Sequence, residues 1–268
     1  MKKYIIFFSI TLTILSLSVL GFINWNNPVT DQIETSSSDI VAFNEQDDKK
    51  IKGPDFPDFF YDLGTRFRGI KKEDLNKARS VIDFLPEEQT QRIVLYKSVS
   101  VIILEDDKQT DIRETGNTEI LTKKQVELLQ SAEYSTNLLI RADYQIMNKE
   151  IGLLENSYST PYLTVVPEKG AVYVSGKEML LEYLKENNRE NTLQVKNNKL
   201  QAAKLYFTVS KKGAITNVNL VKSSGYPSID KAMIELIINA PGTWEPAENY
   251  KGEKVEQELV ISFGMIGC

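Results

Sequence analysis

The clearest pattern of hydrophobic and polar positions lies near the C-terminal end of the chain. In KLYFTVSKKGAITNVNLVKSSG, residues 204–225, apolar side chains alternate with polar ones from Leu205 through Phe207 to Val209. A period of two is typical of a β-strand with one buried face. Gly213 then supplies a residue that tolerates the positive φ of a tight turn, and a second apolar alternation follows it. The segment therefore predicts a β-hairpin.

A helical pattern follows the hairpin, and one more strand follows the helix. In YPSIDKAMIELIINA, residues 226–240, the apolar residues recur on one side of a helix, which Pro241 ends. Ser228 or Asp230 can satisfy free backbone N–H groups at the helix start. Residues 255–263 alternate again, so the order is β-β-α-β: a small antiparallel sheet covered by a helix, in the α+β class. The predicted buried faces hold Ile229, Met233, Leu236, Ile237 and Ala240 on the helix and Val255, Gln257, Leu259, Ile261 and Phe263 on the last strand.

The preceding region, residues 57–168, is predicted to be a second α+β domain. Residues 70–85 carry apolar side chains at helical spacing and predict one helix, whereas residues 92–105 are rich in β-branched side chains and predict strand structure. Residues 137–145 alternate and predict another strand. Two interpretations of this domain stay open, a diverged copy of the C-terminal unit or an unrelated α+β domain. Nothing in its sequence indicates its role.

The N-terminal residues carry a membrane signal. Two lysines precede an uncharged run from Tyr4 to Trp25, which is long enough to cross a bilayer core as a helix. We expect a transmembrane anchor over residues 1–25 with its N-terminus inside. A cleaved signal peptide is the alternative, and in both cases the rest of the chain is exported. Residues 26–56 are polar and mostly acidic, and predict a flexible tether.

Composition limits the chemistry that the chain can perform. The net charge of −5 argues against a nucleic-acid partner, which requires a basic face. The chain has no His, and its single Cys is the last residue, so the commonest general base and metal ligand are missing. The acidic run at residues 105–111 lacks the alternating ligands and the glycine of a calcium loop. We therefore expect no enzymatic activity, no cofactor and no bound metal.

Taken in order, the C-terminal elements resemble the C-terminal domain of TonB proteins. The resemblance covers residues 169–268 and includes the hairpin, the turn before the helix, the helix start, a W-x-P-A turn and the final strand. We interpret the turn as a corner of the backbone and the tryptophan as a core residue. The residues that carry the resemblance are Ser224, Gly225, Ile229, Asp230, Trp244 and Pro246.

The resemblance implies a single-pass protein of the bacterial inner membrane, with a cytoplasmic N-terminus and most of the chain in the periplasm. It also implies docking to a TonB-dependent outer-membrane receptor and energy-dependent transport driven by the ExbB–ExbD motor. An extended peptide can add to an exposed sheet edge, and residues 255–263 are predicted to form that edge. The outward Glu256 and Glu258 equally fit an edge that charge protects from aggregation, so both interpretations stay open.

Two departures from the family pattern favour a second function. The chain contains only nine prolines, and the region 57–168 stands where the family often has a Pro-rich spacer. The predicted anchor also lacks the His that the best-known TonB anchors carry. The alternative is a non-energised envelope scaffold or regulator that reuses the same peptide-binding domain.

Overall fold

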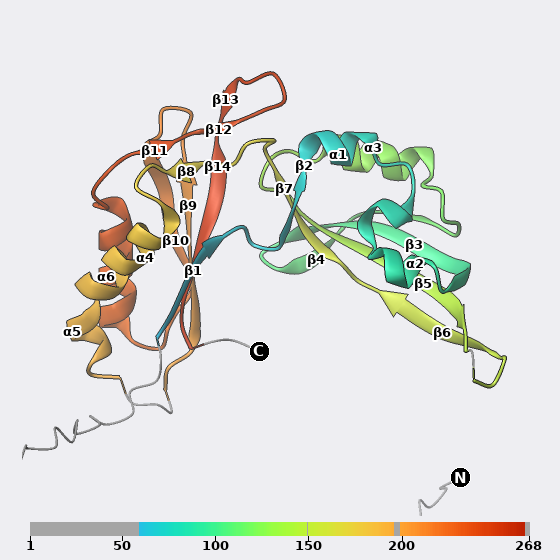
Figure 1. Ribbon diagram of the computed structural model, residues 1–268, viewed down its shortest axis with the longest axis horizontal. Coiled ribbons are helices and arrows are strands. Elements are labelled where there is room, and N and C mark those ends of the chain that lie inside the picture. Colours follow the sequence, from blue (N-terminus) through green and yellow to red (C-terminus); the bar gives the residue numbers. More distant parts are fainter. Residues whose placement is uncertain (1–58, 149, 196–198, 266–268) are drawn as a thin grey trace, which may run out of the picture. The chain divides into compact units, whose positions relative to one another are not determined.

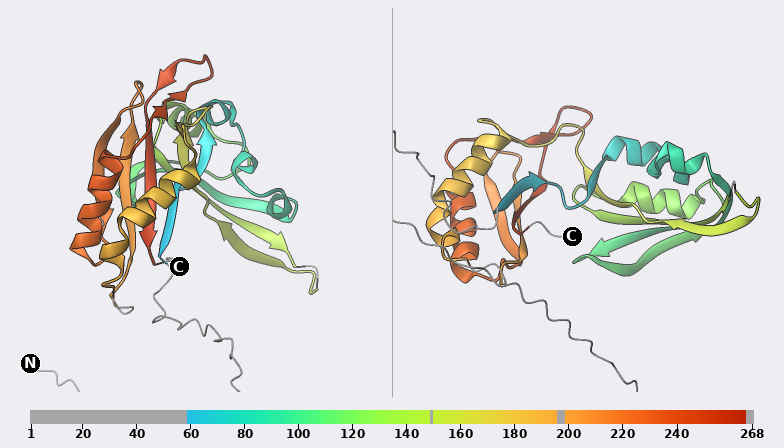
Figure 2. Two further views of the ribbon diagram at one scale, coloured as in Figure 1. Left: turned by 60° about the vertical axis from the view of Figure 1, so that its left-hand side comes forward. Right: turned by 60° about the horizontal axis from the view of Figure 1, so that its bottom comes forward.

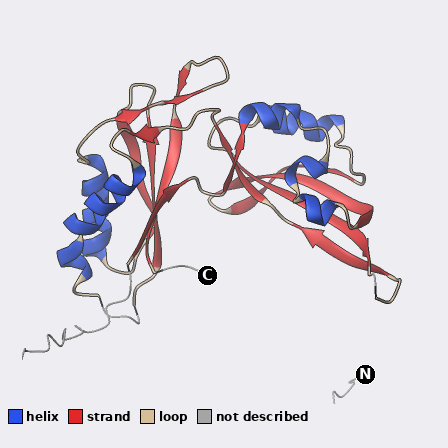
Figure 3. Ribbon diagram, viewed as in Figure 1, coloured by secondary structure: helices blue, strands red, loops and turns tan. Residues whose placement is uncertain are grey.

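The computed structural model describes residues 59–148, 150–195 and 199–265 (Figure 1). Two larger β-sheets organise these residues, and helices cover one face of each sheet (Figure 3). The predicted anchor, residues 1–25, and the predicted tether, residues 26–56, lie outside the described ranges. Within those ranges no helix is both long enough and apolar enough to span a membrane.

The C-terminal sheet has four strands, which come from three separate parts of the chain. They are β1 (Phe60–Gly64), β9 (Ala202–Val209), β10 (Ile215–Lys222) and β14 (Gln257–Gly264). Their order is β1-β14-β9-β10, and every neighbouring pair is antiparallel. Helices α4 (Lys177–Asn187) and α6 (Pro227–Ile238) lie on one face of this sheet (Figure 2). Shorter elements complete this part: β8 (Val172–Tyr173), α5 (Arg189–Thr192), β11 (Trp244–Glu245), β12 (Ala247–Glu248) and β13 (Lys254–Val255).

The predicted β-β-α-β order and the predicted buried faces are confirmed for most positions. One hydrophobic cluster joins the helices to the sheet, because alternate strand residues and one side of each helix point into it. Each fully buried aliphatic or aromatic side chain in such a cluster contributes roughly 1.5–3 kcal/mol. The predicted residues that are buried there are Leu205, Phe207, Val209, Ile229, Met233, Ile237, Leu259, Ile261 and Phe263.

The second sheet belongs to the middle of the chain. Its strands are β2 (Arg68–Lys71), β3 (Ile93–Glu105), β4 (Lys108–Gly116), β5 (Asn137–Met147), β6 (Leu154–Ser159) and β7 (Tyr162–Val166). Their order is β2-β7-β5-β3-β4, and β6 pairs with β5. The helical elements are α1 (Lys72–Lys77), η1 (Val81–Phe84), α2 (Glu87–Thr90) and α3 (Lys123–Ser131).

The single helix predicted over residues 70–85 is wrong. Helix α1 ends at Lys77, and a separate 3-10 turn, η1, begins after Ser80. The Ser80 side chain caps that turn, and the Asp83 carboxylate accepts from the Ser80 amide at 3.1 Å. Ser80 also makes a β-bridge with Ile120, which requires an extended backbone at the point where a continuous helix would pass. A local polar cap and a long-range bridge together outweigh the helical spacing of the apolar residues.

The two sheets share one topological unit. In the middle sheet β3 and β4 form a hairpin, α3 follows, and β5 returns to pair with β3. In the C-terminal sheet β9 and β10 form a hairpin, α6 follows, and β14 returns to pair with β9. The shared order agrees with the hypothesis of a diverged copy. Because unrelated proteins also share simple topologies, common descent stays a hypothesis.

Strand β1 does not follow the domain boundary predicted at residue 57. The sequence assigns this strand to the middle region, whereas it pairs with β14 in the C-terminal sheet. The next strand along the chain, β2, pairs with β7 in the middle sheet. The chain therefore leaves one sheet and enters the other through the residues Thr65, Arg66 and Phe67.

Candidate functional site

The last strand is not an edge of the C-terminal sheet, so the predicted position of residues 255–263 is wrong. Strand β14 lies between β9 and β1, and Val260 to Gly264 pair with Gly64 to Phe60. Val255 belongs to β13, which pairs with β12 in a separate ribbon. The physical reason is that the hydrogen-bonding groups on the outer side of a terminal strand attract another strand, and this chain supplies one itself. The remaining predicted residues, Gln257, Leu259, Ile261 and Phe263, lie on a central strand and are buried rather than displayed at an edge.

Strand β1 fits the outer side of β14 through its own alternation. Phe59, Tyr61 and Leu63 pack against the hydrophobic cluster of the C-terminal sheet. Asp62 projects away from that cluster, and its Oδ1 accepts a hydrogen bond from Lys177 Nζ at 2.6 Å. The sequence pattern does not predict this strand, because Asp62 is the only charged position in residues 59–63 and the alternation is too short to be recognised.

The buried hydroxyl of Tyr61 is poorly accommodated where β1 packs against the C-terminal sheet. Neither the Tyr61 hydroxyl nor the Nδ2 atom of Asn188 has a hydrogen-bond partner among the described residues. Burial raises the pKa of Tyr61 to about 12, and the neighbouring Asn188 side chain opposes that shift. A buried polar atom that is poorly paired costs about 1–3 kcal/mol of desolvation, so the hydroxyl adds little to the attachment of β1.

Tyr61→Phe should therefore leave the free energy of unfolding unchanged or raise it by up to about 1 kcal/mol. The ring keeps its place in the hydrophobic cluster, and only the unpaired hydroxyl is lost. Urea denaturation followed by circular dichroism measures the change. A loss of more than about 1 kcal/mol would show that the hydroxyl has a stabilising partner.

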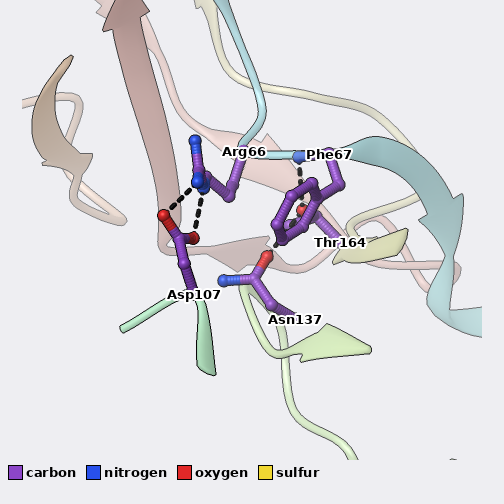
Figure 4. Close-up of polar contacts among 5 residues, drawn as sticks. All are labelled: Arg66, Phe67, Asp107, Asn137 and Thr164. Atoms are coloured by element: carbon purple, nitrogen blue, oxygen red, sulfur yellow. Dashed lines mark hydrogen bonds and ion pairs between the residues drawn. The ribbon is translucent and has the colours of Figure 1, made fainter. Parts of the chain in front are cut away.

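The chain is held firmly immediately after β1 (Figure 4). Arg66 Nε donates to Asp107 Oδ1 at 2.5 Å, and Arg66 Nη2 makes a second contact with Asp107 Oδ2. The Phe67 amide donates to Thr164 Oγ1 at 3.0 Å, and Thr164 Oγ1 donates to Asn137 Oδ1 at 2.7 Å. A bidentate ion pair and a partly buried hydrogen-bond chain thus fix the C-terminal end of the connector to the middle sheet.

The outer side of β14 is also contacted at Glu258, which lies past the end of the pairing with β1. Amides two residues apart in a strand point to the same side, so the Glu258 amide continues the row that begins with Val260. That amide donates to Ser135 Oγ at 3.1 Å. The Glu258 side chain is partly buried, which raises the pKa of its carboxyl group. The outer side of β14 is therefore contacted by β1 from Val260 to Gly264 and by one hydroxyl at the Glu258 amide.

The opposite edge of the sheet is poorly suited to a partner strand. Strand β10 forms that edge, and its pairing with β9 is interrupted between Thr216 and Asn219 and again after Leu220. Asn217 has a φ of 52°. Bulges of this kind twist an edge strand and break the regular row of hydrogen-bonding groups. This leaves the outer side of β14, where a strand is already bound, as the candidate functional surface.

The predicted corner residues hold the start of α6, but the predicted helix cap is wrong. Tyr226 is the N-cap residue, and its side chain makes no capping hydrogen bond. The Asp230 carboxylate instead reaches back to the preceding turn, where it accepts from the Ser224 amide at 2.9 Å and from Ser223 Oγ at 2.5 Å. Gly225 has a φ of 85°, and a Cβ atom there would lie 2.6 Å from the Lys199 carbonyl oxygen. The corner therefore depends on a buried carboxylate and on a residue without a side chain.

Trp244 is a core residue, as predicted. Its indole is 7% exposed and lies between Tyr173 and Phe207, with ring centroids 5.3 Å and 5.5 Å away. Pro246 is buried next to it. Gly213, in the turn between β9 and β10, has a φ of 77°, and a Cβ atom there would lie 2.3 Å from the Trp244 carbonyl oxygen. The tryptophan segment thus packs on the hairpin turn and closes one end of the sheet.

The described residues contain no group of three or more His, Cys, Asp or Glu side chains placed to hold a metal ion. The chemistry that the surface does offer is that of main-chain hydrogen bonding along β14, with an apolar face below it and Lys177 beside it. This is the kind of surface to which an extended peptide can add.

Comparison with known proteins identifies one part of the chain. Residues 196–265 match a family model described as Gram-negative bacterial TonB protein C-terminal. The matched segment contains β9, β10, α6 and β14, but neither β1 nor α4. No curated protein and no solved structure matches the chain.

Proposed function

Because this chain carries a C-terminal domain of the TonB family, we propose that it docks a TonB-dependent outer-membrane receptor by strand addition and supports energy-dependent transport. The observation that carries the proposal is the outer side of β14. Five backbone positions there, Val260 to Gly264, pair with a strand from a distant part of the chain. A sheet that accepts an added strand in this way has the geometry needed to bind an extended segment of a partner.

The proposal includes a location and a motor. The chain is anchored in the bacterial inner membrane by residues 1–25, and most of it lies in the periplasm. The ExbB–ExbD pair supplies force through the anchor. These two statements rest on the sequence of the N-terminal residues and on the family resemblance. We assign the chain no catalytic role, since the TonB C-terminal domain is a transport-associated domain.

A second candidate function is a non-energised envelope scaffold or regulator. Two features of the sequence favour it: the absence of His from the whole chain and the presence of a folded middle sheet where a Pro-rich spacer is expected. In this alternative the domain still binds an extended peptide, but no force is applied.

Deletion of the gene tests the two candidates. For the energised transducer, cells without the protein lose uptake of iron complexes or vitamins, and a plasmid copy of the full chain restores it. The full chain also captures outer-membrane receptors that contain a plug domain. Intact uptake with altered envelope signalling would contradict the transducer and favour the scaffold. A plasmid copy carrying Thr216→Ser, an exposed and conservative change on β10, serves as a matched control.

A further inference from the structure

Strand β6 lies at the margin of the middle sheet (Figure 1). It pairs with β5 on one side, and no strand among the described residues pairs with its other side. The pairing with β5 covers all six residues of β6 without a register shift. Strand β6 therefore presents a regular edge, in contrast with the interrupted edge of β10. The free N–H and C=O groups of such an edge attract another strand, and proteins usually protect them.

The backbone groups that β6 leaves free follow from its pairing with β5. On either side of the paired segment, the Asn148 amide donates to the Leu153 carbonyl at 2.9 Å, and the Ile140 amide donates to the Pro161 carbonyl at 3.1 Å. Hydrogen-bonded and non-hydrogen-bonded pairs alternate along an antiparallel ladder. The residues of β6 whose backbone groups point away from β5 are therefore Leu154, Asn156 and Tyr158.

Exposed apolar side chains gather at the same edge. Leu154 is 46% exposed and Tyr158 is 64% exposed, and Met147, the partner of Leu154 on β5, is also exposed. The end of the hairpin beyond them carries Ile151 and Leu153, which are both more than half exposed. Apolar side chains that gather on a surface in this way mark an interaction site. Strand β6 thus offers main-chain hydrogen bonds and apolar contacts to the same partner.

The edge of β6 is complementary to a second copy of itself. In an antiparallel pair of two β6 strands centred on Asn156, each Leu154 lies opposite Tyr158 of the partner subunit, and the twofold axis repeats this contact. All three outward residues then form hydrogen-bonded pairs, and the central pair is uncharged. The Tyr158 carbonyl accepts from the Tyr144 hydroxyl at 3.3 Å, and its second lone pair is free for an amide of the partner.

Charge favours the same register. A pair centred on Glu155 would bring two carboxylates directly opposite each other, which is unfavourable. In the pair centred on Asn156, each Glu155 instead lies opposite Ser157 of the partner subunit. Ser157 lines a cleft of about 360 Å³ together with Arg92 and Glu88. Arg92 makes no ion pair within the described part of the chain, so it is free to meet the partner's Glu155.

We propose that β6 is the interface of a homodimer, in which the middle sheets of two copies join edge to edge through an antiparallel strand pair centred on Asn156. The occupant of the edge is a second copy of the chain, because the edge matches itself in hydrogen bonding, apolar contacts and charge. A strand pair of this length is small for a protein interface, so the association is weak and reversible. The inference goes beyond the proposed function and does not depend on it, since β6 lies outside residues 196–265.

A disulfide across the twofold axis tests the proposal. The variant is the full chain in mild detergent with Asn156→Cys and Cys268→Ser, treated with a mild oxidant. In the proposed register the two Cα atoms at this position lie about 5.5 Å apart, within the range of a disulfide. The rate at which a dimer appears on a non-reducing gel measures the contact. We expect the dimer to form at least tenfold faster than it does in the control.

The matched control places a single cysteine on the opposite edge of the same sheet. Gln109→Cys with Cys268→Ser changes an exposed residue of β4 and reports random collisions. Ser157→Cys with Cys268→Ser reports the register, and it should also link slowly, because this position lies opposite the partner's Glu155. Equal rates for Asn156→Cys and Gln109→Cys, or faster linking through Ser157→Cys, would overturn the proposal.

A lysine on the edge should block the dimer. Leu154→Lys, added to the Asn156→Cys variant, should slow the cross-linking about tenfold, because it places a charge against the partner's Tyr158. The side chain is exposed in the single chain, so urea denaturation should show unchanged stability. Ile112→Lys, at a residue of β4 that is 52% exposed, is the matched control and should leave the rate unchanged. Equal rates for the two lysine variants would contradict the interface.

An exchange of charges tests the contact between Arg92 and the partner's Glu155. In the Asn156→Cys chain, Arg92→Glu or Glu155→Arg alone should slow the cross-linking about threefold, since exposed ion pairs contribute little. The two substitutions together restore opposite charges across the interface and should recover the original rate. A combined variant as slow as the single ones would overturn this contact and the register that predicts it.

Discussion

Trp244→Ala should destabilise the C-terminal sheet by about 3–5 kcal/mol, the cost of removing a large aromatic side chain from a packed core. The indole fills the space between Tyr173 and Phe207, and its backbone supports the turn at Gly213. Because a small domain is stable by only about 5–15 kcal/mol, the variant should lie close to unfolding at 37 °C. The measurement is chemical denaturation followed by circular dichroism, since the substitution removes Trp244 as a fluorescent reporter of this sheet.

Tyr250→Ala is the control for this prediction. It also removes an aromatic side chain from the same C-terminal region, but Tyr250 is 64% exposed. Its effect should stay within about 0.5 kcal/mol. A loss below about 1 kcal/mol for Trp244→Ala would contradict the role of the indole as a core residue and reopen a role at the surface.

The second large effect is expected at Asp230. Asp230→Ala should cost about 2–4 kcal/mol, because the Ser224 amide is left buried without an acceptor and the Ser223 hydroxyl loses its partner. The turn before α6 then loses its anchor, although the helix keeps its apolar face. Thermal and urea denaturation of the full chain measure the loss.

Two further variants test whether the loss at Asp230 comes from its buried hydrogen bonds. Asp230→Asn keeps one oxygen that can accept from the Ser224 amide, so its loss should be smaller than that of the alanine variant. Glu235→Ala removes a carboxylate from the exposed side of the same helix, where it lies 3.8 Å from Lys231. That change should cost less than about 0.5 kcal/mol. Equal losses for Asp230→Ala and Glu235→Ala would refute the buried hydrogen bonds as the cause.

The stable core positions β14 for the proposed function, and β1 covers its outer side. Pairing with β9 and the buried side chains of Leu259, Ile261 and Phe263 give β14 a fixed position, so its hydrogen-bonding row is already in the geometry of a strand pair. Rigid surfaces bind peptides with a smaller loss of entropy. Strand β1, by contrast, is held by half-buried side chains and one exposed ion pair.

Local patterns in the sequence were sufficient for the hairpin, for α6 and for the buried face of β14. Leu205, Phe207 and Val209 alternate, and Ile229, Met233 and Ile237 recur at helical spacing, because each pattern records which side faces the core. The cap of α6 was predicted wrongly. A carboxylate near a helix start can bond to the helix or to the turn before it, and the fold selected the turn for Asp230.

The sequence by itself determined the β-β-α-β unit, its buried faces and its resemblance to the TonB C-terminal domain. Only the tertiary structure decided which strand lies at the edge of the sheet. The pairing of Phe60–Gly64 with β14 joins segments about 200 residues apart, and a strand of this length has little periodicity to reveal it. Periodicity shows which face of a strand is buried. Which backbone groups are paired depends on every other strand that can reach them, and here β1 pairs with the outer side of β14.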